Sequence, residues 1–128
     1  MFVPVVNTDG SAKIQDHYDK TGELLYKRKN MNDESEKAEG LNCGEMEMGV
    51  DINRNYAYNW KFEDDPCSES FSGTAPFSEP ESRAIRDLME RYKDTIKMVY
   101  NYHSYGPMFV WPYNSELANE LGRKNPLA

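Results

Sequence analysis

The sequence predicts an α/β fold, in which helices flank a mixed, largely parallel sheet. Two observations lead to this prediction. Residues 78–92 have the spacing of an amphipathic helix, and residues 96–103 alternate as a half-buried strand does. A short apolar run, Val3 to Val6, predicts another buried strand near the N-terminus. Strand, helix and strand in this order favour a layered architecture with at least one parallel crossover.

The N-terminal part of the chain contains fewer sequence patterns that predict secondary structure. The run Val3 to Val6 ends in Asn7-Thr8-Asp9-Gly10, which predicts a turn that tolerates a positive φ at Gly10. Little periodicity is visible between Ser11 and Met48. The acidic stretch 32–40 is predicted to be a solvated loop, with a short helix as the alternative.

The clearest predicted helix begins after Ser78. Ser78 is its predicted N-cap, Glu81 completes a capping box, and Pro80 occupies the first turn, where its missing N–H has no cost. The helix is expected to run to about Tyr92 and to cover a sheet. Its predicted apolar face consists of Ile85, Leu88, Met89 and Tyr92.

The C-terminal part predicts two strands and a helix. The first strand, Ile96 to His103, ends at a histidine, and the carboxyl ends of strands are where open α/β sheets place their ligands. The second strand is short, Phe109 to Trp111. A helix is expected over residues 115–121, capped by Asn114 and ended by Gly122.

The length and net charge of the chain limit the classes of protein to which it can belong. A chain of 128 residues has the size of one domain. Its net charge of -7 argues against nucleic acid as a partner, because phosphate backbones are bound by clustered Lys and Arg. No apolar run approaches the ~20 residues of a membrane span, and residues 1–6 lack the basic start of a signal peptide.

Cys43 and Cys67 are the only cysteines. A bridge between them would stabilise the fold by about 3 kcal/mol in the chain-entropy model. Two free thiols of a cytosolic protein fit the sequence equally well.

The triplet Asn53-Arg54-Asn55 is the first candidate binding site. A planar guanidinium beside an amide presents a fork of donors that can grip a carboxylate bidentately. Such a triplet alone is more often part of a solvated loop.

Other motifs surround the triplet in a fixed order: Val6-Asn7-Thr8-Asp9-Gly10, Arg28-Lys29-Asn30, Pro66-Cys67-Ser68-Glu69, Phe77-Ser78-Glu79-Pro80-Glu81, His103-Ser104-Tyr105-Gly106 and Trp111-Pro112-Tyr113. In this order the chain resembles the middle of the catalytic domain of zinc metallocarboxypeptidases of the pancreatic carboxypeptidase A/B type. The resemblance spans almost the whole chain. It implies that residues 1–128 are a central fragment of one carboxypeptidase-like domain, whose remaining parts are the first expected partner.

The resemblance also implies roles for single residues. His103 corresponds to one of three protein ligands of a catalytic zinc. Arg28 resembles the arginine that polarises the scissile carbonyl and stabilises the oxyanion, with Lys27 as the alternative register. Asn53 and Arg54 resemble the pair that binds the terminal carboxylate of a peptide or protein substrate. Ser104 and Tyr105 resemble residues that line the cleft, although Tyr105 fits a packing role equally well.

The resemblance implies one further feature of the family, a disulfide, whereas two other features are missing from this sequence. The secreted members carry a disulfide at positions that resemble Cys43 and Cys67, which implies an extracellular, secretory or vacuolar location. A His-x-x-Glu motif for the other zinc ligands does not occur, and no residue before Ala128 matches the general base, a Glu. The chain alone is therefore expected to be inactive.

Two alternatives remain at this point. A carboxypeptidase-like protein without zinc ligands or base would act as a non-catalytic peptide-binding module. An unrelated acidic α/β domain would require the ordered motifs to match by chance. The departures from the family pattern, Thr8 in place of Pro and the run Lys61 to Asp65, affect a turn and a loop.

Overall fold

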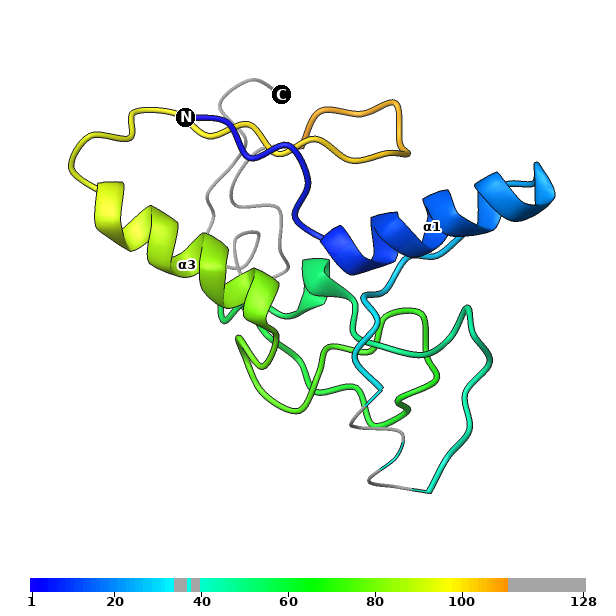
Figure 1. Cartoon of the computed structure of the whole chain (residues 1–128). Coiled ribbons are helices and arrows are strands. Elements are labelled where there is room, and N and C mark those ends of the chain that lie inside the picture. The colour runs from blue at the N-terminus through cyan, green and yellow to red at the C-terminus, as the bar shows by residue number, and fades with distance from the viewer. Residues whose placement is uncertain (34–36, 38–39, 111–128) are drawn as a thin grey trace. The chain divides into compact units, whose positions relative to one another are not determined.

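The computed structural model describes residues 1–33, 37 and 40–110 (Figure 1). The chain forms two compact units, Met1–Asp94 and Thr95–Ala128. In the described residues of the first unit lie helix α1 (Thr8–Thr21), the short 3-10 helix η1 (Ile52–Arg54) and helix α3 (Pro80–Tyr92). No described helix has the length and apolar character needed to cross a membrane.

The N-terminal prediction of a strand and a turn is wrong. Val3 and Val5 of the predicted strand are exposed, to 41% and 45%, Val6 is only partly buried, and α1 begins where the turn was expected. The side chain of Asn7 caps α1 by accepting a hydrogen bond from the Gly10 amide at 3.1 Å. Gly10 is needed for space, since a Cβ there would lie 2.6 Å from Asn7 Nδ2.

The helix predicted after residue 78 is confirmed as α3, but its capping box is wrong. The helix begins at Pro80, its N-cap is Glu79, and no side chain makes the capping hydrogen bond. Ser78 instead donates its hydroxyl to Glu79 Oε1 at 2.8 Å. The position of α3 therefore depends on tertiary contacts of Ser78 and Glu79 and not on a local cap.

The core of the first unit lies between loops. Its buried apolar side chains are Cys43, Val50, Ile52 and Phe71. Single backbone hydrogen bonds join the segments, from the Asn30 amide to the Val50 carbonyl at 3.0 Å and from the Asp51 amide to the Phe71 carbonyl at 2.8 Å. Buried amide side chains complete these contacts, as when Asn30 Oδ1 accepts from the Val50 amide at 2.8 Å.

In the second unit the predicted strands are not found among the described residues. Residues 96–110 contain no strand, and all of them except Ile96 are exposed. The structure therefore does not confirm the strand predicted over Ile96 to His103. Residue 111 of the second predicted strand and the helix expected over 115–121 lie outside the described residues.

Candidate functional site

The turn that carries the Asn-Arg-Asn triplet is the centre of the candidate site. Asp51 is the N-cap of η1, and its Oδ1 accepts a hydrogen bond from the Asn53 amide at 3.0 Å. Asp51 and Ile52 are buried, whereas Asn53 and Arg54 are exposed. The turn therefore carries an exposed amide and an exposed guanidinium on consecutive residues next to a buried base.

Asn55 fixes the other end of this turn. Its side chain is fully buried, so that each of its polar atoms needs a partner inside the protein. The two N–H groups of the amide are shared among three nearby oxygens, and the amide oxygen accepts from two donors. These partners are Ser72 O at 2.8 Å, Ala75 O at 3.1 Å, Ser78 Oγ at 2.8 Å, the Glu79 amide at 3.1 Å and Ser82 Oγ at 2.5 Å. Asn55 thus ties η1 to the start of α3.

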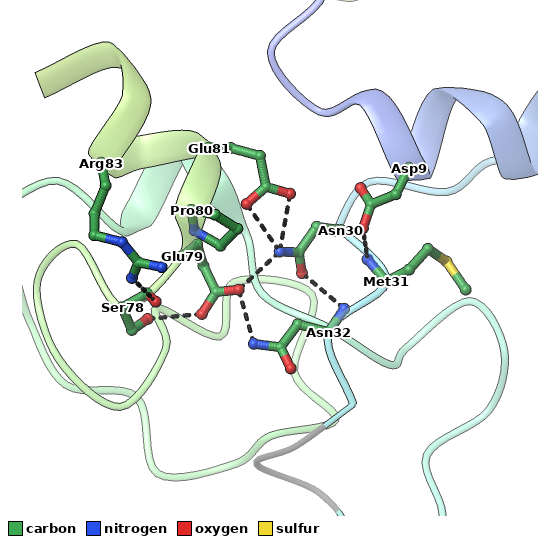
Figure 2. A pocket seen from close by; sticks show the side chains of 9 residues that line it. All are labelled: Asp9, Asn30, Met31, Asn32, Ser78, Glu79, Pro80, Glu81 and Arg83. Atoms are coloured by element: carbon green, nitrogen blue, oxygen red, sulfur yellow. Dashed lines mark hydrogen bonds between the residues drawn. The ribbon is translucent and has the colours of Figure 1, made fainter. Parts of the chain in front are cut away.

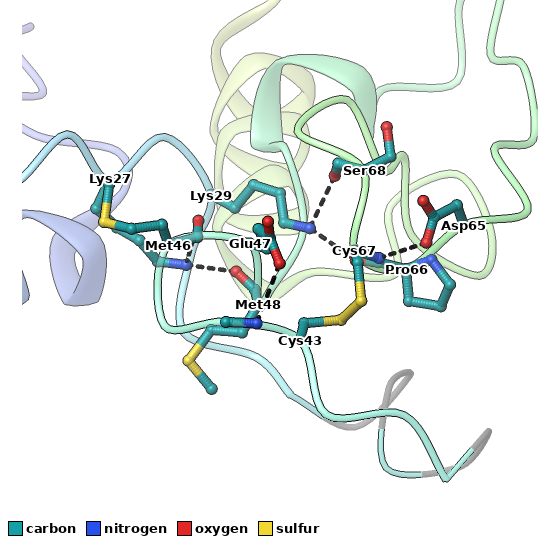
Figure 3. The surroundings of a disulfide bond; sticks show 11 residues. Lys27, Lys29, Cys43, Met46, Glu47, Met48, Asp65, Pro66, Cys67 and Ser68 are labelled. Atoms are coloured by element: carbon teal, nitrogen blue, oxygen red, sulfur yellow. Dashed lines mark hydrogen bonds between the residues drawn. A yellow bond between two sulfur atoms is a disulfide. The ribbon is translucent and has the colours of Figure 1, made fainter.

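The three basic residues 27–29 differ in burial. Lys27 and Lys29 are buried, and their ammonium groups bind backbone carbonyls on the two sides of the disulfide loop (Figure 3). The contacts are Lys27 Nζ to Met46 O at 3.4 Å and to Met48 O, and Lys29 Nζ to Pro66 O at 2.7 Å and Ser68 O at 2.8 Å.

Arg28 is more exposed than these lysines and binds the base of η1. Its Nε and Nη2 donate to one oxygen, Asp51 Oδ2, at 2.9 and 2.7 Å. The carboxylate side chain is 3% exposed and the arginine side chain 45% exposed. Arg28 and the turn that carries Asn53 and Arg54 therefore share Asp51.

The disulfide between Cys43 and Cys67 is confirmed. The two Cα atoms lie 5.3 Å apart across a sequence separation of 24 residues (Figure 3). The loop that it closes contains all of η1, so the bridge limits how far the turn can move.

An open pocket of about 350 Å³ lies where segments from three parts of the first unit meet (Figure 2). Carboxylates in the pocket accept hydrogen bonds from other residues that line it. Glu79 Oε2 accepts from Asn30 Nδ2 at 2.8 Å and Asn32 Nδ2 at 2.9 Å. Asp9 Oδ2 accepts from the Met31 amide at 2.9 Å. These contacts join α1 and α3 to the chain around residue 30. The pocket is lined by Asp9, Asn30, Met31, Asn32, Ser78, Glu79, Pro80, Glu81 and Arg83.

The predicted zinc ligand and cleft residues lie in the second unit. His103, Ser104 and Tyr105 are all exposed, and Asn101 Nδ2 lies 3.2 Å from His103 Nε2. The described residues hold no group of three or more His, Cys, Asp or Glu side chains that fits a metal ion. Within the described part of the chain, His103 is therefore a single candidate ligand and not a metal centre.

Sequence reasoning missed the structural roles of Asp51 and Asn55, which are buried and fix the turn that carries the candidate side chains. The sequence does carry a signal, since both flank the exposed pair Asn53-Arg54 as short polar residues suited to caps and turns. Their burial, however, depends on segments far away in the chain.

Comparisons with known proteins identify the class. The sequence profile of the zinc carboxypeptidase family matches residues 1–125. Carboxypeptidase B of Astacus astacus is 33% identical over 98% of this chain, and carboxypeptidase B of Bos taurus is 31% identical over 88% of it. The chain therefore belongs to the zinc carboxypeptidase family, whose metal is zinc.

A solved structure agrees with this assignment. Bovine thrombin-activatable fibrinolysis inhibitor, in complex with tick carboxypeptidase inhibitor, matches with a TM-score of 0.58 and 31% identity over 92% of this chain. This likeness supports a carboxypeptidase-like α/β fold, although no strand occurs among the described residues. The chain spans 38% of that structure, 39% of the Astacus astacus enzyme and 24% of the Bos taurus enzyme.

Proposed function

We propose that the protein carrying this chain is a zinc carboxypeptidase that removes C-terminal amino acids from peptides. In this proposal the chain is the central part of the catalytic domain and supplies the groups that recognise the substrate's terminal carboxylate. The observation that carries the proposal is the η1 turn, where Asn53 and Arg54 are exposed above a buried, hydrogen-bonded base.

The turn suits carboxylate binding for a physical reason. A guanidinium offers parallel N–H donors that match the two oxygens of a carboxylate, and the neighbouring amide adds a further donor. The Asp51 and Asn55 contacts fix the backbone on both sides, so little conformational entropy is lost when a ligand binds. An internal peptide bond has no carboxylate to fill this site, which explains selectivity for chain ends.

Arg28 is the proposed electrophilic group. A cation held close to the scissile carbonyl stabilises the negative charge that develops on its oxygen in the transition state. The contacts support Arg28 in preference to Lys27, because Lys27 is buried and binds backbone carbonyls. Arg28 is about half exposed and keeps one edge for a ligand.

His103, Ser104 and Tyr105 keep their proposed roles as zinc ligand and cleft residues. When bound, zinc supplies a Lewis acid for the carbonyl and for a water molecule. The described residues do not complete a zinc site, so the other ligands and the general base are proposed to come from the remainder of the domain. The chain alone should therefore have no hydrolytic activity.

The disulfide supports an oxidising location. Bridges such as Cys43–Cys67 persist in extracellular and secretory compartments and are rare in the cytosol. We therefore place the intact enzyme outside the cell or in a secretory or vacuolar lumen.

The test uses the intact, zinc-loaded protein and two matched peptides, one with a free C-terminus and one amidated. Arg54→Ala should lower kcat/KM for the free acid by roughly 30- to 1000-fold, equivalent to about 2–4 kcal/mol. Arg54→Lys should restore only part of the loss, because an ammonium is a point charge. The amidated peptide, a poor substrate, should change little.

Three outcomes are distinguishable. Unchanged hydrolysis of the free acid in Arg54→Ala would overturn the carboxylate-binding role. An intact protein that binds free-acid peptides through Arg54 but does not cleave them would instead be the non-catalytic binding module. Cleavage by the 128-residue chain alone would contradict the proposed division of the site.

A further inference from the structure

We propose that the segment after η1 carries an exposed aromatic surface that binds Lys or Arg side chains of the substrate polypeptide, upstream of the residue that is removed. This inference rests on the proposed function, because it concerns the substrate of the same enzyme. We call this region the aromatic-acidic surface. It consists of Tyr58, Trp60, Phe62, Glu63, Asp64 and Asp65.

The aromatic rings of this surface are exposed although they are large and apolar. Tyr58 and Phe62 are each 63% exposed, and the centre of the Phe62 ring lies 6.0 Å from that of Trp60. Large apolar side chains that are exposed close together typically mark a binding site. The rings therefore offer an aromatic face to a partner.

The backbone around these rings is held in a fixed shape. Trp60 donates its amide to the Ala57 carbonyl at 3.3 Å and its indole Nε1 to the Ser72 carbonyl at 3.2 Å. Asn59 has a φ of 54°, a left-handed conformation that Asn adopts more readily than most residues. The Glu63 amide donates to Ser72 Oγ at 3.3 Å. A surface held in this way loses little conformational entropy when a partner binds.

Ser72 joins the aromatic-acidic surface to the carboxylate-binding turn. Its carbonyl oxygen accepts from Asn55 Nδ2 at 2.8 Å and from Trp60 Nε1 at 3.2 Å, and Ser72 is 2% exposed. Asn55 directly follows Asn53 and Arg54, the proposed carboxylate site. One polypeptide can therefore place its C-terminus at that site and an earlier residue on the aromatic-acidic surface.

The charge of the surface identifies the side chains that it fits. Residues 61–65 carry three carboxylates and one ammonium, which gives a net charge of -2. Glu63 is partly buried, whereas Asp64 and Asp65 are exposed. A Lys or Arg side chain is attracted both to an aromatic face and to a carboxylate, and an anionic side chain is repelled. A cationic stretch of the substrate is therefore the favoured occupant.

The same charges argue that the surface stays open in the intact protein. Burying carboxylates beneath another part of the domain would cost free energy unless each of them gained a partner. The run Lys61 to Asp65 is also a place where this sequence departs from the family pattern. The aromatic-acidic surface is therefore a property of this chain and is not carried over from its relatives.

The test uses the intact, zinc-loaded protein and free-acid peptides of about 12 residues, roughly 40 Å when extended. All peptides end in the same residue, and a Lys-Lys pair is moved stepwise along a Gly and Ser background. A reference peptide lacks the pair. We expect KM to be about 3- to 10-fold lower than for the reference when the pair stands at one or two particular positions, with kcat changed less than about twofold. Equal KM for all peptides would overturn the proposal.

Two substitutions remove the ring and one of the charges. Phe62→Leu keeps an apolar side chain without an aromatic face, and Asp64→Asn keeps the shape without the charge. Each should reduce the advantage of the best Lys-Lys peptide by about 2- to 4-fold, and kinetics with the reference peptide should not change. In about 0.5 M NaCl the effect of Asp64→Asn should shrink, because salt screens exposed charges. An advantage that persists in the double variant would overturn the proposal.

Tyr26→Leu and Asp19→Asn are the matched controls. Tyr26 is 83% exposed, and Asp19 is an exposed residue of α1 whose Oδ1 accepts from Gln15 Nε2 at 2.8 Å. They repeat the loss of a ring and of a charge outside the aromatic-acidic surface, so the advantage of the Lys-Lys peptide should stay as in wild type. An equal loss in the controls would show a general effect of charge and would overturn the proposal.

Other occupants give different results. A separate cationic partner predicts that an amidated Lys-Lys peptide binds to the surface while KM of the substrates does not depend on the position of the pair. The remainder of the domain as occupant predicts that Phe62→Leu and Asp64→Asn lower the stability of the intact protein and leave KM unchanged. Either result would overturn the proposal.

Failure of this inference and failure of the proposed function are distinguishable. If cleavage depends on Arg54 and not on the Lys-Lys pair, only this inference is wrong. If no free-acid peptide is cleaved, the proposed activity is wrong, and fluorescence anisotropy of the same labelled peptides still tests the surface. A Kd that does not depend on the Lys-Lys pair would then overturn this inference as well.

Discussion

The ammonium group of Lys29 lies 2.7 Å from the carbonyl oxygen of Pro66, the residue that precedes Cys67 of the disulfide. Lys29 is 1% exposed, and it also donates to Ser68 O at 2.8 Å and lies 5.6 Å from the centre of the Phe71 ring. A buried charge is tolerated here because carbonyl dipoles and an aromatic face surround it.

Lys29→Met should lower the free energy of unfolding of the intact protein by about 2–4 kcal/mol. Methionine fills much of the same volume, but the Pro66 and Ser68 carbonyls lose a charged donor worth ~1.5–3 kcal/mol each, offset in part by the relieved desolvation of the lysine. Urea unfolding of the oxidised protein measures the change.

Lys20→Met is the control for this prediction. Lys20 pairs with Asp16 at 2.7 Å on the exposed surface of α1, where solvent screens the charges, so that Lys20→Met should change the stability far less than Lys29→Met. An equal effect of the two substitutions would show that the carbonyl contacts of Lys29 contribute nothing.

Replacing both Cys43 and Cys67 with Ser should cost about 3 kcal/mol of stability, because the loop they close spans 24 residues. The loop includes η1, so KM for free-acid peptides should also rise as the Asn53-Arg54 pair becomes less ordered. The measurements are urea unfolding and steady-state kinetics in the absence of reductant. A double variant as stable as wild type would contradict the prediction.

Gly49→Ala should destabilise the protein by at least ~3 kcal/mol. Gly49 has a φ of 95°, and an added Cβ would lie 2.0 Å from the carbonyl oxygen of Asn30. That carbonyl is backbone, so the segment must move and disturb the Asn30–Val50 contacts.

Gly22→Ala separates the two causes of this loss of stability, which are the steric overlap of the added Cβ and the strain of a positive φ. Gly22 also has a positive φ, 74°, but nothing lies within 4 Å of its added Cβ. It should cost only about 1 kcal/mol for the left-handed backbone. A difference in stability between the two alanine variants smaller than ~1 kcal/mol would show that overlap with the Asn30 carbonyl does not cause the larger loss expected for Gly49→Ala.

Local signals made part of the fold predictable. Pro80 and the helical spacing of Ile85, Leu88 and Met89 are contained within α3, so the sequence predicted this helix and its end at Tyr92. Helix α1 was missed because it is largely polar, although its Asn7 cap and Gly22 at its end were visible. The strands predicted at Val3 to Val6 and at Ile96 to His103 were not confirmed, because strand pairing depends on a distant partner, which no sequence window contains.

The candidate site was predictable to a similar extent. Asn53 and Arg54 are local and were found from the triplet, and family resemblance supplied Arg28. The structural roles of Asp51 and Asn55 were not predicted, because they depend on contacts with Phe71 and the start of α3, which lie many residues away in the sequence. Buried polar groups of this kind are determined by tertiary structure.

Tyr56, next to the triplet, gives a prediction on pH. Burial, with a smaller contribution from the Glu81 carboxylate, raises the pKa of the Tyr56 hydroxyl above its ordinary value of 10.0. The folded protein therefore holds this proton more tightly than the unfolded chain. The stability contributed by neutral Tyr56 is complete below about pH 10 and is lost as pH rises from there through the folded-state pKa.

The measurement is urea unfolding of the intact protein and of Tyr56→Phe between pH 8 and 11. The unfolding free energy of the wild type minus that of Tyr56→Phe should be constant up to about pH 10. It should then decrease as the pH rises, because only the wild type has this proton to release. The ring contact with Phe77, 5.9 Å between centres, is available to phenylalanine as well, so packing should largely cancel. Glu81→Gln should leave most of the effect, since burial is its larger cause. A difference that stays constant to pH 11, or that vanishes in Glu81→Gln, would contradict this assignment.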